Sequence, residues 1–169
     1  MGDQRAPSRA SFVQYVEFGL LKRMANNDIK FVMVGSTAAY AYGLDVQPKD
    51  VDMVVAYERE TWQRILELAE TEDPQPGGVR RITDEPKSFP TQLHFGLGRG
   101  IDVLSGLQHA SFAELYSRST EGVVGVELLD DLLLPIRVAS LSDLMESWRT
   151  RGDDRDSELI RAAEVLSTT

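Results

Sequence analysis

Three aspartates are the residues of this chain whose type and spacing could do chemistry. Asp50 and Asp52 are two residues apart at the start of an apolar run, and alternate side chains of a strand point to the same face. Two neighbouring carboxylates repel each other unless a cation lies between them. Because Mg²⁺ takes oxygen ligands and commonly combines one or two carboxylates with substrate phosphates, the pair predicts a divalent metal site.

Asp102 is the third carboxylate, in a second strand-like run. It could complete the metal site or accept the proton of an attacking hydroxyl. We therefore assign Asp50, Asp52 and Asp102 as candidate catalytic and metal-binding residues. The structural alternatives are a solvated strand start for the first two and a residue flanking a glycine turn for Asp102.

Gly35 and Ser36 lie between an apolar run and a segment of small residues typical of a helix. Backbone N–H groups at the start of a helix lack partners, and the helix dipole is positive there, so this corner suits a phosphate. Gly35 would permit close approach of a ligand, and Ser36 would donate its hydroxyl or cap the helix. Lys49 is either a phosphate partner or a surface charge. These three residues form the predicted nucleotide-binding set.

The hydrophobic pattern predicts the elements that must position these residues. Strand-like runs cover 29–34, 50–57 and 79–82, and the glycines around residue 99 predict a hairpin between 91–97 and 100–106. Shorter strand-like pieces lie near 123–128 and 136–138. Amphipathic or capped segments predict helices over 11–25, 37–43, 58–70, 111–119, 141–148 and 153–166.

This pattern predicts an α/β (α+β) fold in which a mixed β-sheet is flanked by helices and followed by a short C-terminal helical segment. We expect a single domain overall. It would consist of an N-terminal helix in residues 1–28, a core in 29–139 and C-terminal helices in 140–169 packed on that core.

Composition narrows the chemistry further. The chain has 169 residues and no cysteine, which excludes disulfides and thiolate catalysis, so a metal must be held by oxygen or by one of two histidines. His94 is expected to pack at the sheet, with a place beside Asp102 as the alternative, and His109 is expected at the surface. Basic residues gather around 80–99 and 149–161, for which solvated surface is the simpler interpretation.

The net charge of −9 argues against broad, sequence-independent binding of nucleic acid. No apolar run approaches the roughly 18 residues that a membrane helix needs. The first residues also lack the apolar core of a signal peptide. We therefore expect a cytoplasmic protein with no membrane partner.

The order of these motifs resembles the nucleotidyltransferase superfamily of the polymerase-beta type. Within it, the chain is similar to AbiEii-like toxin nucleotidyltransferases and related small domains. The similarity spans roughly residues 29–166 and rests on the segments Gly35-Ser36-Thr37-Ala38, Lys49-Asp50-Val51-Asp52, Ile101-Asp102-Val103 and Ser140-Leu141-Ser142-Asp143-Leu144, followed by Gly152 and Arg155-Asp156.

The resemblance implies Mg²⁺- or Mn²⁺-dependent transfer of a nucleoside monophosphate from a nucleoside triphosphate to a hydroxyl of protein, RNA or a small molecule. It also implies a toxin–antitoxin setting, in which a cognate antitoxin or regulator is a candidate partner. The segment Val46-Gln47-Pro48 departs from relatives, which commonly have Arg and Thr there. The alternative function is therefore a catalytically degenerate nucleotide- or protein-binding module of the same fold.

Overall fold

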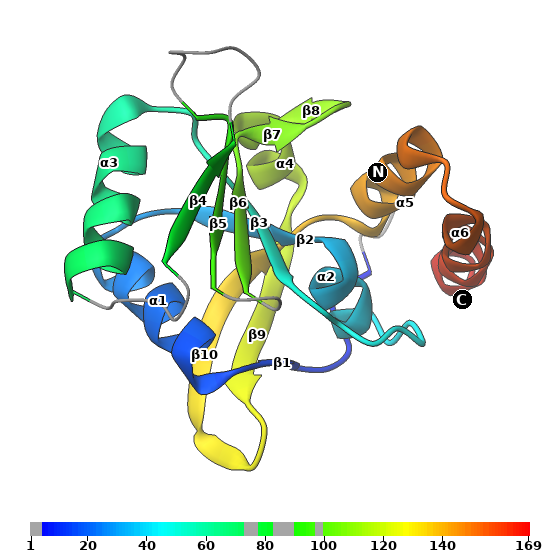
Figure 1. Cartoon of the computed structure of the whole chain (residues 1–169). Helices are drawn as coiled ribbons and strands as arrows, with labels where there is room; N and C mark the ends of the chain where they lie inside the picture. The colour runs from blue at the N-terminus through cyan, green and yellow to red at the C-terminus, as the bar shows by residue number, and fades with distance from the viewer. Residues whose placement is uncertain (1–4, 73–77, 83–89, 97–99) are drawn as a thin grey trace.

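The computed structural model describes residues 5–72, 78–82, 90–96 and 100–169. A large mixed sheet lies at the centre with helices around it (Figure 1). Its strands are β1 (Ser11–Val13), β2 (Phe31–Val34), β3 (Val51–Val55), β4 (Val79–Ile82), β5 (Gln92–Phe95), β6 (Ile101–Leu104), β9 (Thr120–Val126) and β10 (Leu129–Val138). They run in the order β1-β9-β10-β2-β3-β6-β5-β4, and β7 (Gly106–Leu107) and β8 (Ala110–Ser111) form a separate pair. The predicted fold class is confirmed.

The helices are α1 (Tyr15–Asn26), α2 (Gly35–Ala41), α3 (Arg59–Glu67), α4 (Phe112–Arg118), α5 (Leu141–Arg151) and α6 (Asp154–Ser167), with a π-helical turn η1 (Leu68–Glu72) after α3. Figure 1 shows α1 and α3 on one side of the molecule and α5 and α6 on the opposite side. Within the described residues, no helix combines the length and the apolar character that a membrane crossing demands.

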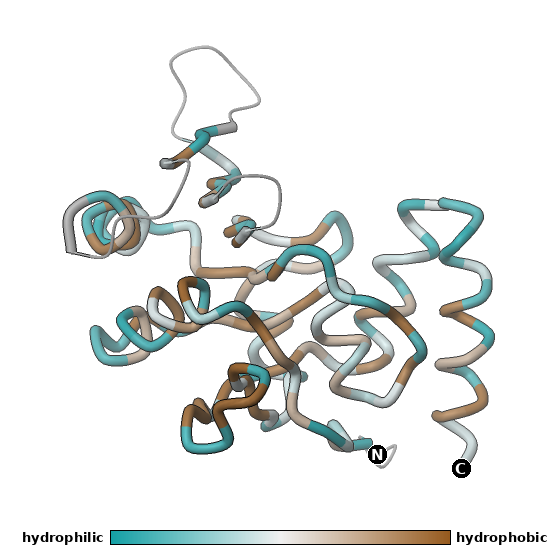
Figure 2. Tube along the Cα trace, turned by 60° about the horizontal axis from the view of Figure 1, so that its bottom comes forward, coloured by the Kyte–Doolittle hydropathy of each residue, from teal (hydrophilic) through white to brown (hydrophobic). Residues whose placement is uncertain are grey.

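The centre of the sheet follows from the two unbroken apolar runs. All residues of β2 are buried, and β3 is buried except at Asp52, which is half-buried. Strands that are covered on both faces have such continuous apolar sequences. Figure 2 shows hydrophobic segments through the middle of the trace, with further hydrophobic stretches on outer loops and helices. One carboxylate thus interrupts the core of the sheet.

The N-terminal helix is shorter than predicted, because residues 11–13 form strand β1. Ser11 pairs with Val124 in a parallel ladder, and its hydroxyl donates to the carbonyl oxygen of Thr37 at 2.8 Å. Helix α1 begins at Tyr15, where the Gln14 N–H donates to the Glu17 carboxylate at 2.9 Å. The four-residue spacing that includes Phe12 misled the prediction, because Phe12 is exposed.

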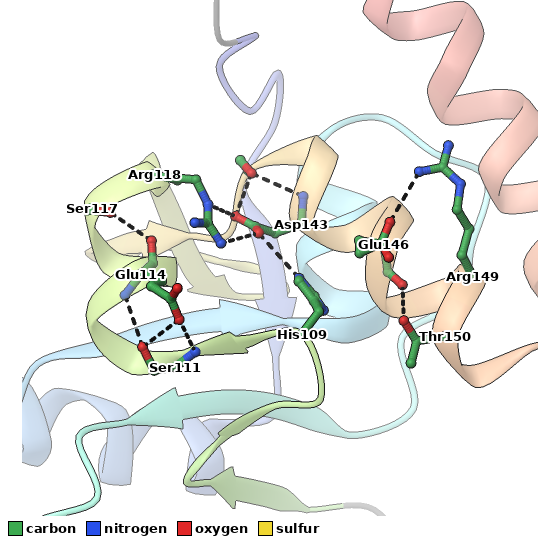
Figure 3. A network of polar contacts seen from close by, with 10 residues as sticks. His109, Ser111, Glu114, Ser117, Arg118, Asp143, Glu146, Arg149 and Thr150 are labelled. Atoms are coloured by element: carbon green, nitrogen blue, oxygen red, sulfur yellow. Dashed lines mark hydrogen bonds and ion pairs between the residues drawn. The ribbon is translucent and has the colours of Figure 1, made fainter.

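A buried carboxylate joins α4 to α5. Asp143 accepts two hydrogen bonds from Arg118, at 2.7 and 3.1 Å, and one from the Ser140 hydroxyl at 2.7 Å (Figure 3). His109 Nε2 lies 3.3 Å from the same carboxylate, and the His109 side chain is only 16% exposed. The prediction of a surface His109 is therefore wrong. These hydrogen bonds connect α5 to α4.

Asp143→Asn should destabilise the fold by about 2 kcal/mol at neutral pH, near the low end for a broken ion pair because Arg118 is 42% exposed. Burial raises the pKa of Asp143, but hydrogen bonds from Arg118 and Ser140 outweigh burial and lower that pKa overall. The ionised form therefore stabilises the folded state above the ordinary carboxyl pKa of 3.8, and this stabilisation is lost as the pH falls through the folded pKa.

Urea unfolding of both proteins at pH 7 and near pH 3 measures the difference. The difference in free energy of unfolding between wild type and Asp143→Asn should narrow at the lower pH. The control Asp131→Asn, at an exposed position of β10, should unfold like wild type at both pH values. If wild type and Asp143→Asn differ by the same unfolding free energy at both pH values, the charge of Asp143 does not stabilise the fold.

Candidate active site

The sheet register places two of the three predicted aspartates side by side. Asp52 on β3 is opposite Val34 at the end of β2 and opposite Asp102 on β6, and Asp102 is in turn opposite His94 on β5. Residues in register on adjacent strands point to the same face of a sheet. Asp52, Asp102 and His94 therefore form one row across three strands.

Asp102 is held in place by two neighbours on β5. Gln92 Nε2 donates to Asp102 Oδ1 at 3.0 Å, and His94 Nδ1 lies 2.9 Å from the same oxygen. The side chains of His94 and Asp102 are 12% and 15% exposed. The structure thus supports the alternative for His94, beside Asp102, and the carboxylate has one oxygen engaged by β5.

Asp50 lies one residue before β3 and is held by the main chain of Gly100. The Gly100 N–H donates to Asp50 Oδ1 at 3.2 Å, and the Val51 N–H donates to the Gly100 carbonyl at 2.8 Å. The Thr37 hydroxyl also donates to the Asp50 carbonyl at 3.1 Å. The segment that carries Asp50 is therefore fixed by both β6 and α2.

Gly35 explains how the β2–α2 corner approaches the carboxylates. Its φ is +67°, and a Cβ at this position would lie 2.3 Å from Asp52 Oδ2. Only glycine adopts this backbone conformation without strain and leaves room for the carboxylate. Val34 occupies the N-cap position of α2, so Ser36 is inside the first turn and does not cap the helix.

The electrostatics of Asp52 reflect this crowding. Burial and the negative charges of Asp102 and Asp50 raise the pKa of Asp52 to about 7, and a hydrogen bond with Asp102 acts in the same direction. Arg151 opposes the shift. The ionised form of Asp52 is therefore disfavoured unless a positive charge enters this corner.

A cavity of about 660 Å³ opens in front of Asp50 and Asp52. Its lining includes Ser36 and Lys49, and α5 and α6 contribute acidic residues as well as Arg151 and Arg155. One cavity thus contains four of the predicted residues, Asp50, Asp52, Ser36 and Lys49. In the described structure Asp102 lies outside its lining, next to Asp52 on the neighbouring strand.

Two residues of this site were not predicted. Arg151 forms ion pairs with Asp156 and, at 3.3 Å, with Asp153, and its charge acts on Asp52. Gln92 was expected only as a strand residue. Neither role is marked by the local sequence, because the charge of Arg151 acts on Asp52 from a distant part of the chain and Gln92 reaches Asp102 only through the strand register.

The donor set at this corner suits a hard divalent cation. Within the described residues, no group of three acidic or histidine side chains could hold a metal ion by itself. Asp50 and Asp52 nevertheless present carboxylate oxygens to one cavity, and Mg²⁺ usually binds one or two carboxylates and completes its shell with phosphates and water. The excess of negative charge around Asp52 favours such a cation.

The fold has counterparts among solved structures. The solution structure of the antibiotic-resistance factor ANT(2'')-Ia aligns with a TM-score of 0.56 at 17% identity, over 90% of this chain and 88% of that chain. The crystal structure of ANT(2'')-Ia in complex with adenylyl-2''-tobramycin aligns with a TM-score of 0.48 at 15% identity, over 89% and 91% of the two chains. No protein-family model and no curated protein matches the sequence. The first alignment shows a shared fold.

Proposed function

We propose that this chain is a metal-dependent nucleotidyltransferase that moves a nucleoside monophosphate from a nucleoside triphosphate to a hydroxyl group. The observation that carries the proposal is that Asp50 and Asp52 share a cavity with Lys49 and two arginines, with Asp102 next to Asp52 on the neighbouring strand. The shared fold with ANT(2'')-Ia, an aminoglycoside nucleotidyltransferase, is consistent with it.

In this proposal Asp50 and Asp52 hold a Mg²⁺ or Mn²⁺ ion, with Asp102 beside them as a third carboxylate. When bound, the ion neutralises charge on the phosphates and on the leaving pyrophosphate. Gly35 lets the main chain approach Asp52, and Gly100 holds Asp50, so the two carboxylates are already positioned before substrate binds. Such placement lowers the barrier by reducing the reorganisation that the reaction requires.

The cavity cations would orient the triphosphate. Lys49 comes from the same segment as Asp50, whereas Arg151 and Arg155 come from the opposite wall. Arg151 forms ion pairs with Asp153 and Asp156, and its positive charge also acts on Asp52 from the lining of the same cavity. We assign phosphate contacts to Lys49, Arg155 and the Ser36 hydroxyl.

Asp102 would act on the acceptor. Its Oδ1 is engaged by Gln92 and His94, and its carboxylate also shares a hydrogen bond with Asp52. We assign this carboxylate as the group that accepts the proton of an attacking hydroxyl. We infer a small-molecule acceptor, as for the structural neighbour ANT(2'')-Ia. A protein or RNA acceptor in a toxin–antitoxin setting is the alternative that the AbiEii-like motifs suggest.

The experiment is incubation with each α-labelled nucleoside triphosphate and Mg²⁺ or Mn²⁺. Polyhydroxylated small molecules, cell extract and purified RNA serve as separate acceptors. Label in a small-molecule product supports the proposal, and label on protein or RNA supports the alternative acceptor. Tight metal-nucleotide binding with no transfer to any acceptor would contradict catalysis and indicate the degenerate binding module.

His94→Gln should lower kcat by about tenfold and leave KM for the nucleotide nearly unchanged, because His94 holds Asp102 and does not line the nucleotide cavity. Steady-state kinetics at saturating acceptor concentration measure kcat and the KM for the nucleotide separately. His109→Gln serves as the control because His109 contacts Asp143, away from the three aspartates. A rise in KM with unchanged kcat would show that His94 contacts the nucleotide instead.

Arg155→Gln should weaken triphosphate binding by about five- to tenfold, because a partly exposed charged contact contributes roughly 1 kcal/mol. Titration with a non-hydrolysable triphosphate in Mg²⁺ measures the dissociation constant. The matched control is Arg161→Gln, which removes an exposed arginine of the same helix outside the cavity lining. Equal affinities of the two variants would remove Arg155 from the proposed phosphate contacts.

A further inference from the structure

A second cavity, of about 740 Å³, lies apart from the acid-lined cavity, and within the described chain the two have no lining residue in common. Val123, Leu133, Pro135 and Ile136 from the β9–β10 hairpin form part of its wall, and Phe31 at the start of β2 forms another part. A largely apolar concavity of this size is typical of small-molecule sites. We call it the hairpin cavity.

The polar residues of the hairpin cavity are mainly cationic. Arg9, Lys30 and Arg137 line it, and Glu121 is the one carboxylate among its described lining residues. This reverses the balance of the whole chain, whose net charge is −9. A local excess of positive charge on an acidic protein favours an anion at that place.

The cations of the hairpin cavity are positioned by oxygens that carry no formal charge. Arg137 donates to the Ser119 hydroxyl at 2.9 Å and to the Ser119 carbonyl, although Glu121 is its cross-strand neighbour. Arg9 donates to the carbonyl oxygens of Tyr40, at 2.7 Å, and Leu44, at 2.9 Å. These bonds orient both guanidinium groups, and among the described residues no carboxylate forms an ion pair with either.

Tyr116 gives the hairpin cavity an aromatic surface between two of these cations. The Lys30 ammonium and the Arg137 guanidinium each lie 5.7 Å from the centroid of the Tyr116 ring. Cation–π attraction holds them near the ring. The cavity therefore combines apolar wall, aromatic surface and at least two cations directed to the same place.

We propose that the hairpin cavity binds a small amphipathic anion. The apolar, preferably aromatic, body of this ligand packs against Val123, Leu133 and Pro135, and its carboxylate, sulfonate or phosphate group faces Lys30 and Arg137. This site is independent of the proposed transfer reaction, since it uses none of the residues assigned to metal or nucleotide.

A matched pair of fluorescent probes tests both halves of this proposal. 8-Anilinonaphthalene-1-sulfonate has the aromatic body and a sulfonate, and N-phenyl-1-naphthylamine has nearly the same body without the charge. We expect saturable binding of the sulfonate probe at one site per chain, at least about fivefold tighter than the neutral probe. Equal affinities would show that apolar surface alone binds the probe, and would overturn the proposal.

Variants then locate the site. Lys30→Gln and Arg137→Gln should each weaken binding of the sulfonate probe by about five- to tenfold and leave the affinity for the neutral probe unchanged. Arg161→Gln should change neither probe. A loss of binding in Arg155→Gln would place the probe in the acid-lined cavity, and a loss in Leu128→Ser would place it on the exposed hairpin turn.

Either of those two results would overturn the assignment. Thermal melting of every variant is measured beside binding, and Lys30 is exposed, so Lys30→Gln should keep the wild-type Tm. If Arg137→Gln unfolds, the affinity of Lys30→Gln for the sulfonate probe alone tests the proposal.

Discussion

Asp52→Asn should lower kcat for nucleotidyl transfer by about 10³-fold or more, since it removes the central carboxylate of the row. The same change should raise the Tm of the metal-free protein. Burial and the negative charges of Asp102 and Asp50 disfavour the ionised carboxylate of Asp52, and an uncharged side chain of the same shape avoids both costs. Loss of activity together with gain of stability separates a functional role from misfolding.

The matched control is Asp45→Asn, which neutralises another carboxylate in the lining of the same cavity. It should retain activity within a few-fold of wild type, because Asp45 lies outside strands β3, β5 and β6, which carry the row of Asp52, Asp102 and His94. Rates with Mg²⁺ and Mn²⁺, and melting with and without metal, complete the measurement. An Asp52→Asn protein that transfers nucleotide at the wild-type rate would refute the assignment of Asp52.

Gly35→Ala should have the second largest effect. A methyl group would lie 2.3 Å from Asp52 Oδ2, and the backbone has a φ of +67° that alanine adopts only with strain. Strain and steric overlap together should destabilise the fold by about 2–4 kcal/mol. Displacement of Asp52 should lower kcat by about 10²-fold, since misplacement by about 1 Å has effects of this size.

Gly78→Ala separates strain from overlap. Gly78 has a φ of +71°, but a Cβ there would meet no atom within 4 Å. The Gly78→Ala variant should therefore lose only about 1–2 kcal/mol of unfolding free energy and keep full activity. Urea unfolding and kcat are measured for both variants. If Gly35→Ala behaves like Gly78→Ala in both measurements, the tight contact with Asp52 has no functional consequence.

The sequence predicted that Asp50 and Asp52 lie close together, and their role in a site stays a prediction. The two-residue spacing of Asp50 and Asp52 before an apolar run predicts a shared face, and both residues line one cavity, Asp52 from β3 and Asp50 from the residue before it. The hairpin of β5 and β6 was predicted from its glycines, and its antiparallel pairing is confirmed, although residues 97–99 of the turn lie outside the described structure.

Other features depend on contacts between distant segments, which periodicity does not encode. The parallel pairing of β3 with β6 and of β1 with β9 joins residues far apart in the chain. Three-residue β1 is too short to show an alternating pattern. Arg151 has the sequence context of a solvated arginine, and only the packing of α5 and α6 brings its charge near Asp52.

A crystal structure with Mn²⁺ and a non-hydrolysable nucleoside triphosphate tests most directly whether the three aspartates form a metal-nucleotide site. We predict anomalous density for manganese in contact with the carboxylates of Asp50 and Asp52, with the phosphates completing its shell toward Lys49 and Arg155. Nucleotide bound elsewhere, or bound in this cavity with no metal at the two carboxylates, would contradict the account.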